Sequence, residues 1–302
     1  MPPRIVVVGS LMMDLVVRAP RLPLVGESLL SHSFQTSPGG KGANQAIAAA
    51  RMGASVAMVG RIGRDRFGEI LRMKLEEAGV DASNVSVDPE IGTGVAVPIV
   101  LDSGENAIFA VPQANMTLGV AEIEAARRLI EAADTLMLNF EVGMDAVDAA
   151  ARIASSAGVP ILLNPAPIAP YSPLLPALAR VLVANEVEAA ALVPEFAGDH
   201  ALELKNLLRM SPRVLITLGA DGLIGGDVEG TFSLPAFPVT AVDSVGAGDA
   251  FCGALAVRLA EGCGLQEAAR FASAAGALAV TKPGAQASLP LRSEVEALIG
   301  LN

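Results

Sequence analysis

Apolar residues fall along this chain in two alternating patterns. Short runs of β-branched and other apolar residues predict buried strands at 5–8, 55–59, 135–138, 161–163, 181–183 and 214–217. Alanine-rich stretches predict helices near 43–52, 67–78, 120–132, 146–157, 186–192, 247–260, 265–280 and 293–298. Continuous apolar strands that alternate with helices are typical of a mostly parallel sheet. We therefore expect an α/β fold with helices on both faces of such a sheet.

Two stretches break this alternation, because each contains two strand-like segments with no helix between them. The first pairs 14–17 with 28–35, and the second pairs 94–101 with 107–111. These segments predict a small separate sheet, a lid over one edge of the main body. The lid strands would be inserted at about 12–36 and 93–111 into a single domain that spans residues 1–302.

One long stretch, 153–179, carries no charge and could be mistaken for a membrane span. It contains Pro160, Pro165, Pro167, Pro170, Pro173 and Pro176. Proline removes a helix hydrogen bond and clashes with the preceding turn, so a spanning helix with this content is excluded. We expect no membrane association.

The charge balance is acidic, with 21 Lys and Arg residues against 32 Asp and Glu residues, a formal net charge of −11. Aromatic residues make up only 3% of the chain. Nucleic acids are bound through cationic contacts to phosphates and through aromatic stacking, so this composition disfavours them. Two cysteines, Cys252 and Cys263, and two histidines are too few for a disulfide framework, a metal cluster or a Ser-His-Asp triad. A small ligand and a reducing, cytoplasmic location fit best.

The segment VDSVGAGDAFCGAL, 242–255, places the carboxylate of Asp249 directly after a glycine-rich turn and at the start of an apolar helix. Gly246 and Gly248 can adopt positive φ, so the turn can direct several N–H groups toward one point. The helix dipole adds positive potential there, which suits an anion. Asp is also a favoured helix N-cap, so the segment alone leaves open whether Asp249 caps the helix or performs chemistry.

A second glycine cluster, PGGKGANQAIAAARMGA, spans 38–54 and precedes another helix. It does not match the phosphate loop GxxxxGK[ST], because Gly42 follows Lys41 where Ser or Thr is required. The dinucleotide pattern GxGxxG is missing here and around Gly246, which disfavours a dehydrogenase. Taken alone, the cluster fits either a tight strand-to-helix connection or a backbone surface for a ligand.

Several motifs occur in a fixed order: GGKGAN at 39–44, NPAP at 164–167, NEVE at 185–188, TLG at 217–219, GAGD at 246–249 and AVTKPGAQASLP at 279–290. Together they resemble the ribokinase-like family of carbohydrate kinases over essentially the whole chain. The resemblance implies an ATP-dependent kinase that transfers the γ-phosphate to a sugar hydroxyl, here expected to be the 5-hydroxyl of D-ribose. It also implies Mg²⁺ with the ATP, an activating K⁺ and a homodimer through the lid strands.

In this family the Asp of GAGD is the general base, and the resemblance assigns that role to Asp249. The turn from Gly246 would provide an anion hole through the amides of Ala247, Gly248 and Asp249. Phosphoryl transfer depends mainly on alignment and on stabilising charge. A carboxylate that orients the hydroxyl and accepts its proton beside an anion hole suits this chemistry.

The resemblance assigns the other site residues one position at a time. The expected sugar contacts are Met12, Asp14, Gly40, Lys41, Gly42, Asn44, Glu141 and Asp249. The expected nucleotide contacts are Asn185, Thr217, Gly219, Asp221, Gly222, Gly248 and Ser273, of which Ser273 is a weak match. Glu188 would hold Mg²⁺ through water, and a potassium site would comprise Asp243, Val245, Ala279, Lys282, Gly284 and Ser288, with Lys282 contributing only its carbonyl. Glu188 and Ser273, taken singly, also fit a solvated helix face.

One position departs from the family pattern. Members usually carry Asn two residues before the lid Asp, whereas this chain has Met12 before Asp14. A thioether hardly accepts hydrogen bonds, so a sugar hydroxyl at this point would lose a partner. The departure makes 2-deoxyribose an alternative substrate, unless Met12 simply packs under the lid.

Other activities of the same fold stay open. A nucleoside kinase would need aromatic residues in the lid, where only Phe34 and Phe109 occur. A kinase for sugar phosphates would need extra cations there, where Arg18 and Arg21 are the candidates. A non-catalytic sugar sensor would have no need of Asp249.

The lid strands also carry alternating apolar residues that one small sheet cannot hide from water. These are Leu15, Val17, Val95, Val97 and Ile99. Alternation places them on one face of the sheet. A second copy of the chain is expected to cover that face.

Overall fold

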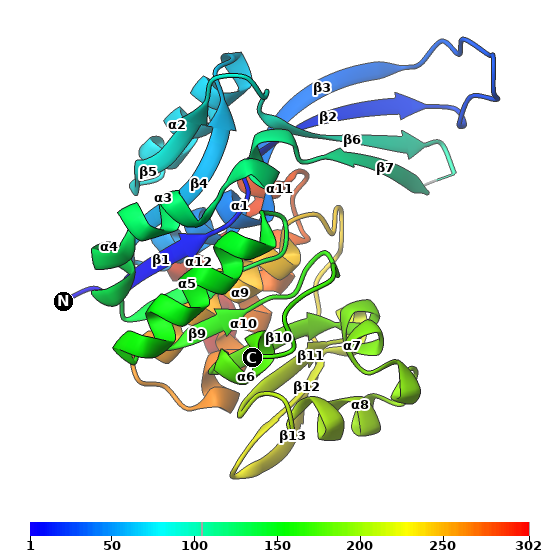
Figure 1. Ribbon diagram of the computed structural model, residues 1–302. Helices are drawn as coiled ribbons and strands as arrows, with labels where there is room; N and C mark the ends of the chain where they lie inside the picture. Colours follow the sequence, from blue (N-terminus) through cyan, green and yellow to red (C-terminus); the bar gives the residue numbers. More distant parts are fainter. Residues whose placement is uncertain (104, 302) are drawn as a thin grey trace.

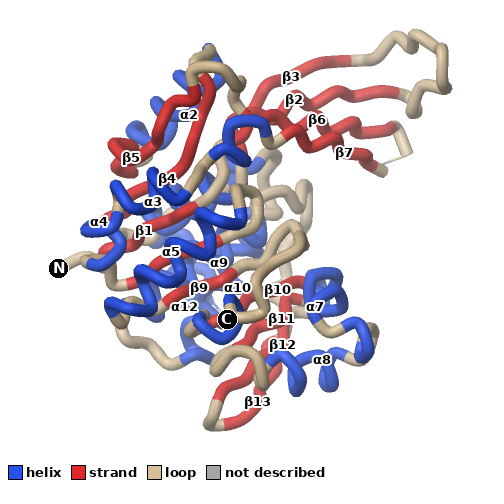
Figure 2. Tube along the Cα trace, in the orientation of Figure 1, coloured by secondary structure: helices blue, strands red, loops and turns tan. Residues whose placement is uncertain are grey.

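The computed structural model describes residues 1–103 and 105–301, and its body is a nine-stranded sheet with helices on both faces (Figure 1, Figure 2). The strand order is β13-β12-β11-β10-β9-β8-β1-β4-β5. The strands are β1 Arg4–Val8, β4 Ser55–Gly63, β5 Val80–Asp88, β8 Thr135–Leu138, β9 Ile161–Leu163, β10 Val181–Asn185, β11 Val214–Thr217, β12 Leu223–Asp227 and β13 Gly230–Leu234. All neighbours from β5 to β11 pair in parallel, whereas β12 and β13 are antiparallel.

Each face of the sheet has its own apolar core. In β1, Ile5 and Val7 point into one core while Val6 and Val8 point into the other. The first face is covered by α1 Lys41–Arg51, α2 Arg66–Glu77, α9 Ala247–Ala260, α10 Leu265–Ala279 and α12 Arg292–Leu301. The second is covered by α3 Val120–Ala125, α4 Arg127–Glu131, α5 Met144–Ala157, α6 Leu175–Leu178, α7 Glu186–Leu192 and α8 His200–Leu207. The predicted α/β fold is thus confirmed.

Some elements differ from the sequence prediction. Three strands, β5, β12 and β13, were not predicted, because they are short of continuous apolar runs. β5 alternates polar with apolar residues, and β12 contains two glycines. The predicted helix at 120–132 is two helices, α3 and α4, separated at Ala126. Helix α8 was also missed. The remaining short helices are α11 Ala285–Ser288 and the 3₁₀ turns Gln113–Thr117, Pro194–Phe196 and Gly219–Asp221.

The predicted lid is a separate four-stranded sheet that projects from one end of the body (Figure 1). Its order is β3-β2-β6-β7, from β2 Met12–Ala19, β3 Ser33–Gly39, β6 Gly94–Leu101 and β7 Asn106–Val111. The predicted strand at 28–35 is wrong in its bounds. Pairing begins where Arg18 faces Ser33, and the chain before it turns around an ion pair between Arg21 and Glu27.

The register of the lid gives it two distinct faces. Val17 lies opposite Phe34 on one side and Ile99 on the other, and Val97 lies opposite Phe109. Because side chains alternate along a strand, this face is apolar. Met12 and Asp14 lie on the opposite face.

The buried side chain of Asn115 joins the two segments that connect lid and body. Its Oδ1 accepts a hydrogen bond from the Leu11 N–H at 2.9 Å, and its Nδ2 donates to the Leu11 carbonyl at 2.9 Å and to the Pro112 carbonyl at 3.0 Å. Leu11 precedes β2, and Pro112 follows β7. One amide therefore ties together the chain entering the lid and the chain leaving it.

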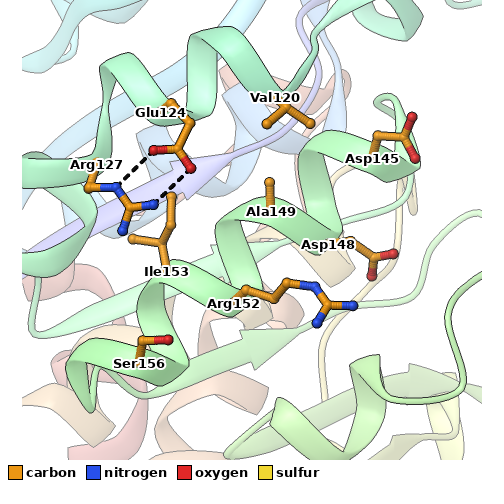
Figure 3. Close-up of a pocket in the computed structure, with 9 residues that line it drawn as sticks. All are labelled: Val120, Glu124, Arg127, Asp145, Asp148, Ala149, Arg152, Ile153 and Ser156. Atoms are coloured by element: carbon orange, nitrogen blue, oxygen red, sulfur yellow. Dashed lines mark hydrogen bonds and ion pairs between the residues drawn. The ribbon is translucent and has the colours of Figure 1, made fainter.

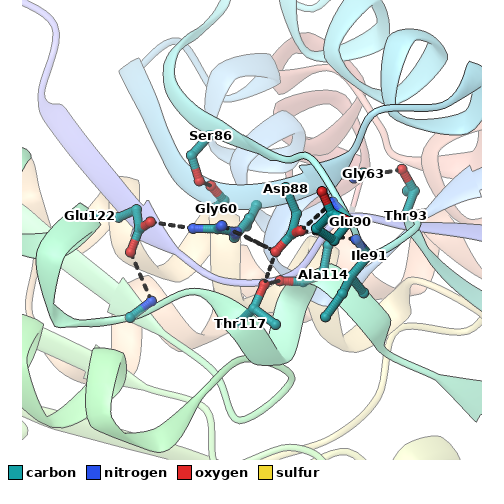
Figure 4. A network of polar contacts seen from close by, with 12 residues as sticks. Gly60, Gly63, Ser86, Asp88, Glu90, Ile91, Thr93, Ala114, Thr117 and Glu122 are labelled. Carbon is teal, nitrogen blue, oxygen red and sulfur yellow. Dashed lines mark hydrogen bonds and ion pairs between the residues drawn. The ribbon is translucent and has the colours of Figure 1, made fainter.

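A polar network holds the turn between β5 and the lid strand β6 (Figure 4). Asp88 ends β5, and its carboxylate accepts hydrogen bonds from the N–H groups of Glu90 and Ile91 at 3.0 and 2.9 Å. It also accepts from the Thr117 hydroxyl at 2.7 Å and from Arg61 Nε at 3.1 Å. Four donors on one carboxylate fix the direction in which the chain leaves the body for the lid.

Among the described residues, no helix combines the length and the apolar character that crossing a membrane would require.

Candidate active site

The predicted site residues meet at the carboxyl ends of the parallel strands, next to the lid. Glu141 follows β8, while Asn185 and Thr217 end β10 and β11. Ser10 and Asn164, which were not predicted for the site, follow β1 and β9 at the same edge. In open α/β sheets this edge is where ligands bind. The helices α1 and α9 also begin there, so both glycine clusters of the sequence face the same region.

The first glycine cluster makes the sharp entry into α1. Gly40 has a φ of 91°, a conformation that favours glycine, and α1 begins at Lys41, two residues before the predicted start. A Cβ on Gly42 would lie 2.5 Å from the Gly9 carbonyl carbon, so only glycine permits this approach. Glu141 accepts a hydrogen bond from the Lys41 N–H at 2.9 Å and contacts the Ser10 hydroxyl. The predicted sugar ligand Glu141 is therefore fixed at the start of α1.

The second glycine cluster places Asp249 at the start of α9 without using it as a cap. Gly246, with a φ of 82°, is the N-cap residue, and no side chain caps this helix. The Asp249 carboxylate instead accepts hydrogen bonds from Asn44 Nδ2 at 2.9 Å and from Gln45 Nε2 at 3.1 Å. The capping interpretation of Asp249 is thus wrong, since its partners lie on α1.

One of the three amides that the resemblance assigns to an anion hole is already hydrogen-bonded within the chain. The Ala247 N–H donates to the Ser244 carbonyl at 3.3 Å, which closes the turn before α9. Gly248 and Asp249 are the next two helical residues, and N–H groups in the first turn of a helix have no acceptor within it. The exposed Gly248 and its neighbour Asp249 are left as the main amide donors.

Charges of both signs surround Asp249. Burial raises the pKa of its carboxyl, and the positive charge of Lys41 and the hydrogen bond from Asn44 counteract this. Burial alone would lower the pKa of Lys41, but Asp249 and Glu141 outweigh it, so the pKa of the ammonium group is raised. A buried carboxylate beside the Lys41 ammonium, whose pKa is raised, suits a proton acceptor next to a transferred phosphoryl group.

Asp14 extends toward this cluster from the lid. Its carboxylate lies over Gly39, where an added Cβ would be 2.6 Å from Oδ2. Burial raises the pKa of Asp14 to about 7, and Glu141 and Asp249 contribute to the increase. Met12 lies on the same face of β2 and is buried, with 4% of its surface exposed.

Five of the predicted nucleotide residues lie along the same sheet edge: Asn185, Thr217, Gly219, Asp221 and Gly222. Asn185 and Thr217 are direct neighbours in the pairing of β10 with β11. The 3₁₀ turn Gly219–Asp221 follows, and the φ values of Gly219 and Gly222 are 54° and 92°. Ser273, on α10, donates its hydroxyl hydrogen to the Ala269 carbonyl of the same helix at 2.9 Å. Its hydroxyl is left only as an acceptor for a ligand.

Two surface hollows lie away from these groups. One, of about 450 Å³, lies between α3 and α5 and contains the Glu124–Arg127 ion pair, with Asp148 and Arg152 opposite (Figure 3). Another, of about 620 Å³, lies between β13 and the start of α10. Neither hollow is lined by a residue that the sequence motifs predicted for the site.

Sequence reasoning missed several buried polar residues around Asp249 and Glu141. They are Ser10, Gln45, Asn139 and Asn164, and each has at most 8% of its surface exposed. Gln45 lies in the second glycine cluster, 38–54, and Asn164 lies in the motif NPAP. Both motifs were recognised, but no role was assigned to these two residues. Their function depends on contacts between elements far apart in the chain.

Comparisons with known proteins agree with this arrangement. A model of the pfkB family carbohydrate kinases matches residues 2–292. The ribokinase of Bacillus subtilis strain 168 is 41% identical over 295 residues, covering 98% of this chain and 99% of that one. The deoxyribokinase of Salmonella typhi is 31% identical over 303 residues, covering 99% of each. The structure of Arabidopsis thaliana ribokinase complexed with ribose and ATP has a TM-score of 0.90 at 31% identity, covering 99% of each chain.

These similarities extend over nearly the whole chain, and they include both glycine clusters and the lid. The buried carboxylate of Asp249 at a helix start, the adjacent Lys41 and the lid residue Asp14 lie together at the edge of the sheet where such folds bind ligands. This chain belongs to the pfkB family of carbohydrate kinases and is an ATP-dependent carbohydrate kinase.

Proposed function

We propose that this kinase transfers the γ-phosphate of ATP to the 5-hydroxyl of D-ribose. The observation that carries the proposal is the placement of Asp249 at the start of α9, with both carboxylate oxygens hydrogen-bonded from α1 and Asp14 facing it from the lid. The ribokinases of Bacillus subtilis and Arabidopsis thaliana give the sugar class by similarity. Release of ADP, followed with pentoses, hexoses and nucleosides, tests the proposal. Turnover of nucleosides alone would reject it.

In the proposed reaction, Asp249 orients the 5-hydroxyl and takes its proton as the new O–P bond forms. The amides of Gly248 and Asp249, with the Lys41 ammonium, stabilise the charge on the transferred phosphoryl group. Asp14, Asn44 and the backbone at Gly40 hold the remaining hydroxyls, whereas Gly42 packs against Gly9 and donates its N–H to Ser10 Oγ at 3.3 Å. Glu141 keeps the start of α1 in position for these contacts.

A second substrate, 2-deoxyribose, is favoured by Met12. The residue lies between Gly39 and Gly94 in the register of the lid, on the same face as Asp14. It offers a sugar an apolar thioether in place of a hydrogen-bonding amide. The similarity to the deoxyribokinase of Salmonella typhi supports the same alternative.

Replacing Met12 with Asn is expected to raise the preference for ribose over 2-deoxyribose. A sugar hydroxyl without a partner costs about 1–3 kcal/mol, so the ratio of the two kcat/KM values should change by roughly 10–100-fold. Steady-state kinetics with both sugars, on the parent chain and on Met12→Asn, measure this ratio. An unchanged ratio would mean that Met12 only packs under the lid.

We further propose that Glu188 holds Mg²⁺ through water rather than directly. Its Oε2 and Oε1 accept hydrogen bonds from the Asn185 N–H at 2.9 Å and from Asn185 Nδ2 at 3.0 Å, so both oxygens already serve a helix cap. The described residues include no group of three or more His, Cys, Asp or Glu side chains that could hold a metal. Such a site fits Mg²⁺ bound mainly by phosphates and water, where it would neutralise charge on the nucleotide.

A potassium site is proposed at the loops around Asp243. The Asp243 carboxylate accepts hydrogen bonds from the Val245 N–H at 3.0 Å and from the Gly284 N–H at 2.9 Å, which joins the anion-hole turn to the loop before α11. The other expected members, Ala279, Lys282 and Ser288, lie in or beside that loop. Carbonyl oxygens here suit a monovalent cation, and the Lys282 ammonium is engaged with Glu294 at 3.0 Å.

Potassium is therefore expected to raise kcat. A cation between these loops would hold the turn at Gly246 against Ala285, whose Cα lies 3.2 Å from where a Gly246 Cβ would be. Activity compared in potassium and sodium buffers of equal ionic strength measures the effect. Equal rates in the two buffers would remove the potassium site from the proposal.

The apolar lid face is proposed as a homodimer interface. Phe34 and Phe109 on this face expose 62 and 65% of their surfaces, and Leu15, Val17, Val95, Val97 and Ile99 are half-buried. Sedimentation is expected to give a dimer at micromolar concentration, and Phe109→Lys should give a monomer with the same fold. A monomeric parent chain would contradict the interface.

We also propose a cytoplasmic location for the enzyme. Cys252 and Cys263 are both free thiols, which fits a reducing compartment.

A further inference from the structure

Gln45 lies behind Asp249 and is buried. It belongs to α1 and has 0% of its surface exposed. Its Nε2 donates to Asp249 Oδ1 at 3.1 Å and to Asn164 Oδ1 at 3.2 Å. Because an amide NH₂ has two hydrogens, one group can serve both acceptors. Gln45 thus links the end of β9 with the start of α9.

Asn164 fixes the orientation of this amide. Its own Nδ2 donates to the Val183 carbonyl of β10 at 3.0 Å, so its Oδ1 is turned toward Gln45. The result is a chain of hydrogen bonds from the backbone of the central sheet to the Asp249 carboxylate. If the Gln45 amide were flipped, its carbonyl oxygen would face two acceptor oxygens. The hydrogen bonds around it therefore exclude the flipped orientation.

The crossing of α1 and α9 brings Gln45 within reach. Gly253 lies one turn beyond Asp249, and a Cβ there would be 2.6 Å from Ala48 Cβ and 2.9 Å from the Gln45 carbonyl oxygen. Only glycine permits the two helices to approach this closely. The short distance between their backbones allows a single glutamine side chain to span the gap.

From this geometry we infer that Gln45, oriented by Asn164, is a positioning residue for Asp249 that holds one carboxylate oxygen while the substrate hydroxyl approaches. The inference rests on the proposed phosphoryl transfer with Asp249 as base. Asn44 binds the other oxygen, Oδ2, so each oxygen has one donor and keeps a further lone pair. The carboxylate cannot rotate away from the hydroxyl, and its ionised form is stabilised by both bonds.

Several ionisable groups face Asp249 and contribute to its titration. They are Asp14 on β2, Lys41 on α1, Glu141 after β8, Glu188 on α7 and Cys252 on α9. The side chain of Gln45 donates a hydrogen bond to none of these five groups. A difference between the parent chain and a Gln45 variant therefore reports the loss of one hydrogen bond to the base.

The test replaces Gln45 with Met, which keeps the length of the side chain but removes the donor. We expect kcat to fall roughly 10–100-fold with the KM for ATP unchanged, since a hydrogen bond to a charged group is lost. The acid limb of kcat should move to higher pH by about one unit, because Asp249 becomes easier to protonate. Measuring kcat at saturating sugar separates this limb from the titration of Asp14, which acts on sugar binding.

Gln113→Met is the matched control. It removes one hydrogen bond, which Gln113 Nε2 donates to the Thr93 carbonyl at 2.9 Å, and this bond involves no group of the site. The acid limb of kcat for Gln113→Met should match that of the parent chain. Asn164→Ala should show the same shift as Gln45→Met, and the double variant should show less than the sum of the two effects. If Gln45→Met does not fold, Asn164→Ala decides the question.

A readout without turnover separates this inference from the proposed function. Asp249 has a raised pKa in the folded chain, so its ionisation lowers the free energy of unfolding as pH rises. As pH rises above about 4, Gln45→Met should lose more stability than the parent chain does, and this difference should vanish in an Asp249→Asn background. A parent chain that phosphorylates no pentose would reject the proposed function only. A folded Gln45→Met variant with parental kcat, acid limb and pH-dependent stability would overturn the inference.

Discussion

Asp249→Asn is expected to lower kcat by roughly 10²–10⁴, the usual contribution of a general base. The asparagine amide keeps the shape of the side chain but cannot accept the proton of the sugar hydroxyl. The fold should persist, because Asp249 caps no helix and its partners Asn44 and Gln45 are side chains of α1. The nucleotide residues Asn185 and Thr217 lie on other strands. ATP affinity should therefore change little.

Single-turnover rates and ATP titration by calorimetry measure the two quantities independently. Asp221→Asn serves as a control for removing one carboxylate from the same sheet edge, and it should alter ATP affinity rather than the rate of transfer. If Asp249→Asn retains near-normal turnover, Asp249 is not the base. Loss of ATP binding together with turnover would instead indicate that the anion-hole turn has collapsed.

Asp14→Asn is expected to reduce kcat/KM for the sugar by about 10²-fold while stabilising the fold at alkaline pH. The reduction follows because an amide can replace only part of the acceptor capacity of a carboxylate that faces several hydroxyls. The stabilisation follows from the pKa of Asp14, about 7 in the folded chain and near its ordinary value when unfolded. The folded state binds the proton more tightly, so stability is lost as pH rises from about 4 toward 7.

The variant removes this cost, so its free energy of unfolding should exceed that of the parent chain by about 1–3 kcal/mol at pH 8. Near pH 4 the two chains should be equally stable. In the parent chain, kcat/KM for the sugar should rise with pH through about 7 as Asp14 ionises. Denaturant titrations at both pH values and a pH series of kcat/KM provide the measurements. If the variant and the parent chain are equally stable at pH 8 as well as near pH 4, Asp14 is not buried with the other carboxylates.

The sequence predicted those elements whose signal is local. Buried strands such as β1 and β8 are uninterrupted apolar runs, and the positive φ of Gly40 and Gly246 matches the glycine clusters. The edge strands β5 and β13 were missed because each is held by pairing with its neighbouring strand and has no uninterrupted apolar run of its own. β5 pairs only with β4, and polar residues such as Asp81 and Ser83 are exposed on it, so its pattern differs little from that of a loop.

Some residues of the candidate site were likewise predicted from the sequence, and others were not. Asp249 was singled out because its motif places a carboxylate after a glycine turn, whereas Lys41 and Asp14 were assigned through the resemblance to the kinase family. The positions of Gln45 and Asn164 could not be deduced, since their contact spans 119 residues and depends on how α1 crosses α9. The double hydrogen bond of Glu188 with Asn185 was equally hidden, although both residues belong to one short motif.

The link made by Asn115 has a consequence for building chimeras between related kinases. The lid reaches the body through two separate lengths of chain, and one buried amide bonds to both. A graft of residues 12–39 alone would leave the β2–β6 pairing and the Asn115 contacts with mismatched partners. Residues 12–39 and 94–115 therefore form one interchangeable module, and a transplanted lid must carry both lengths to preserve its sugar face and its apolar face together.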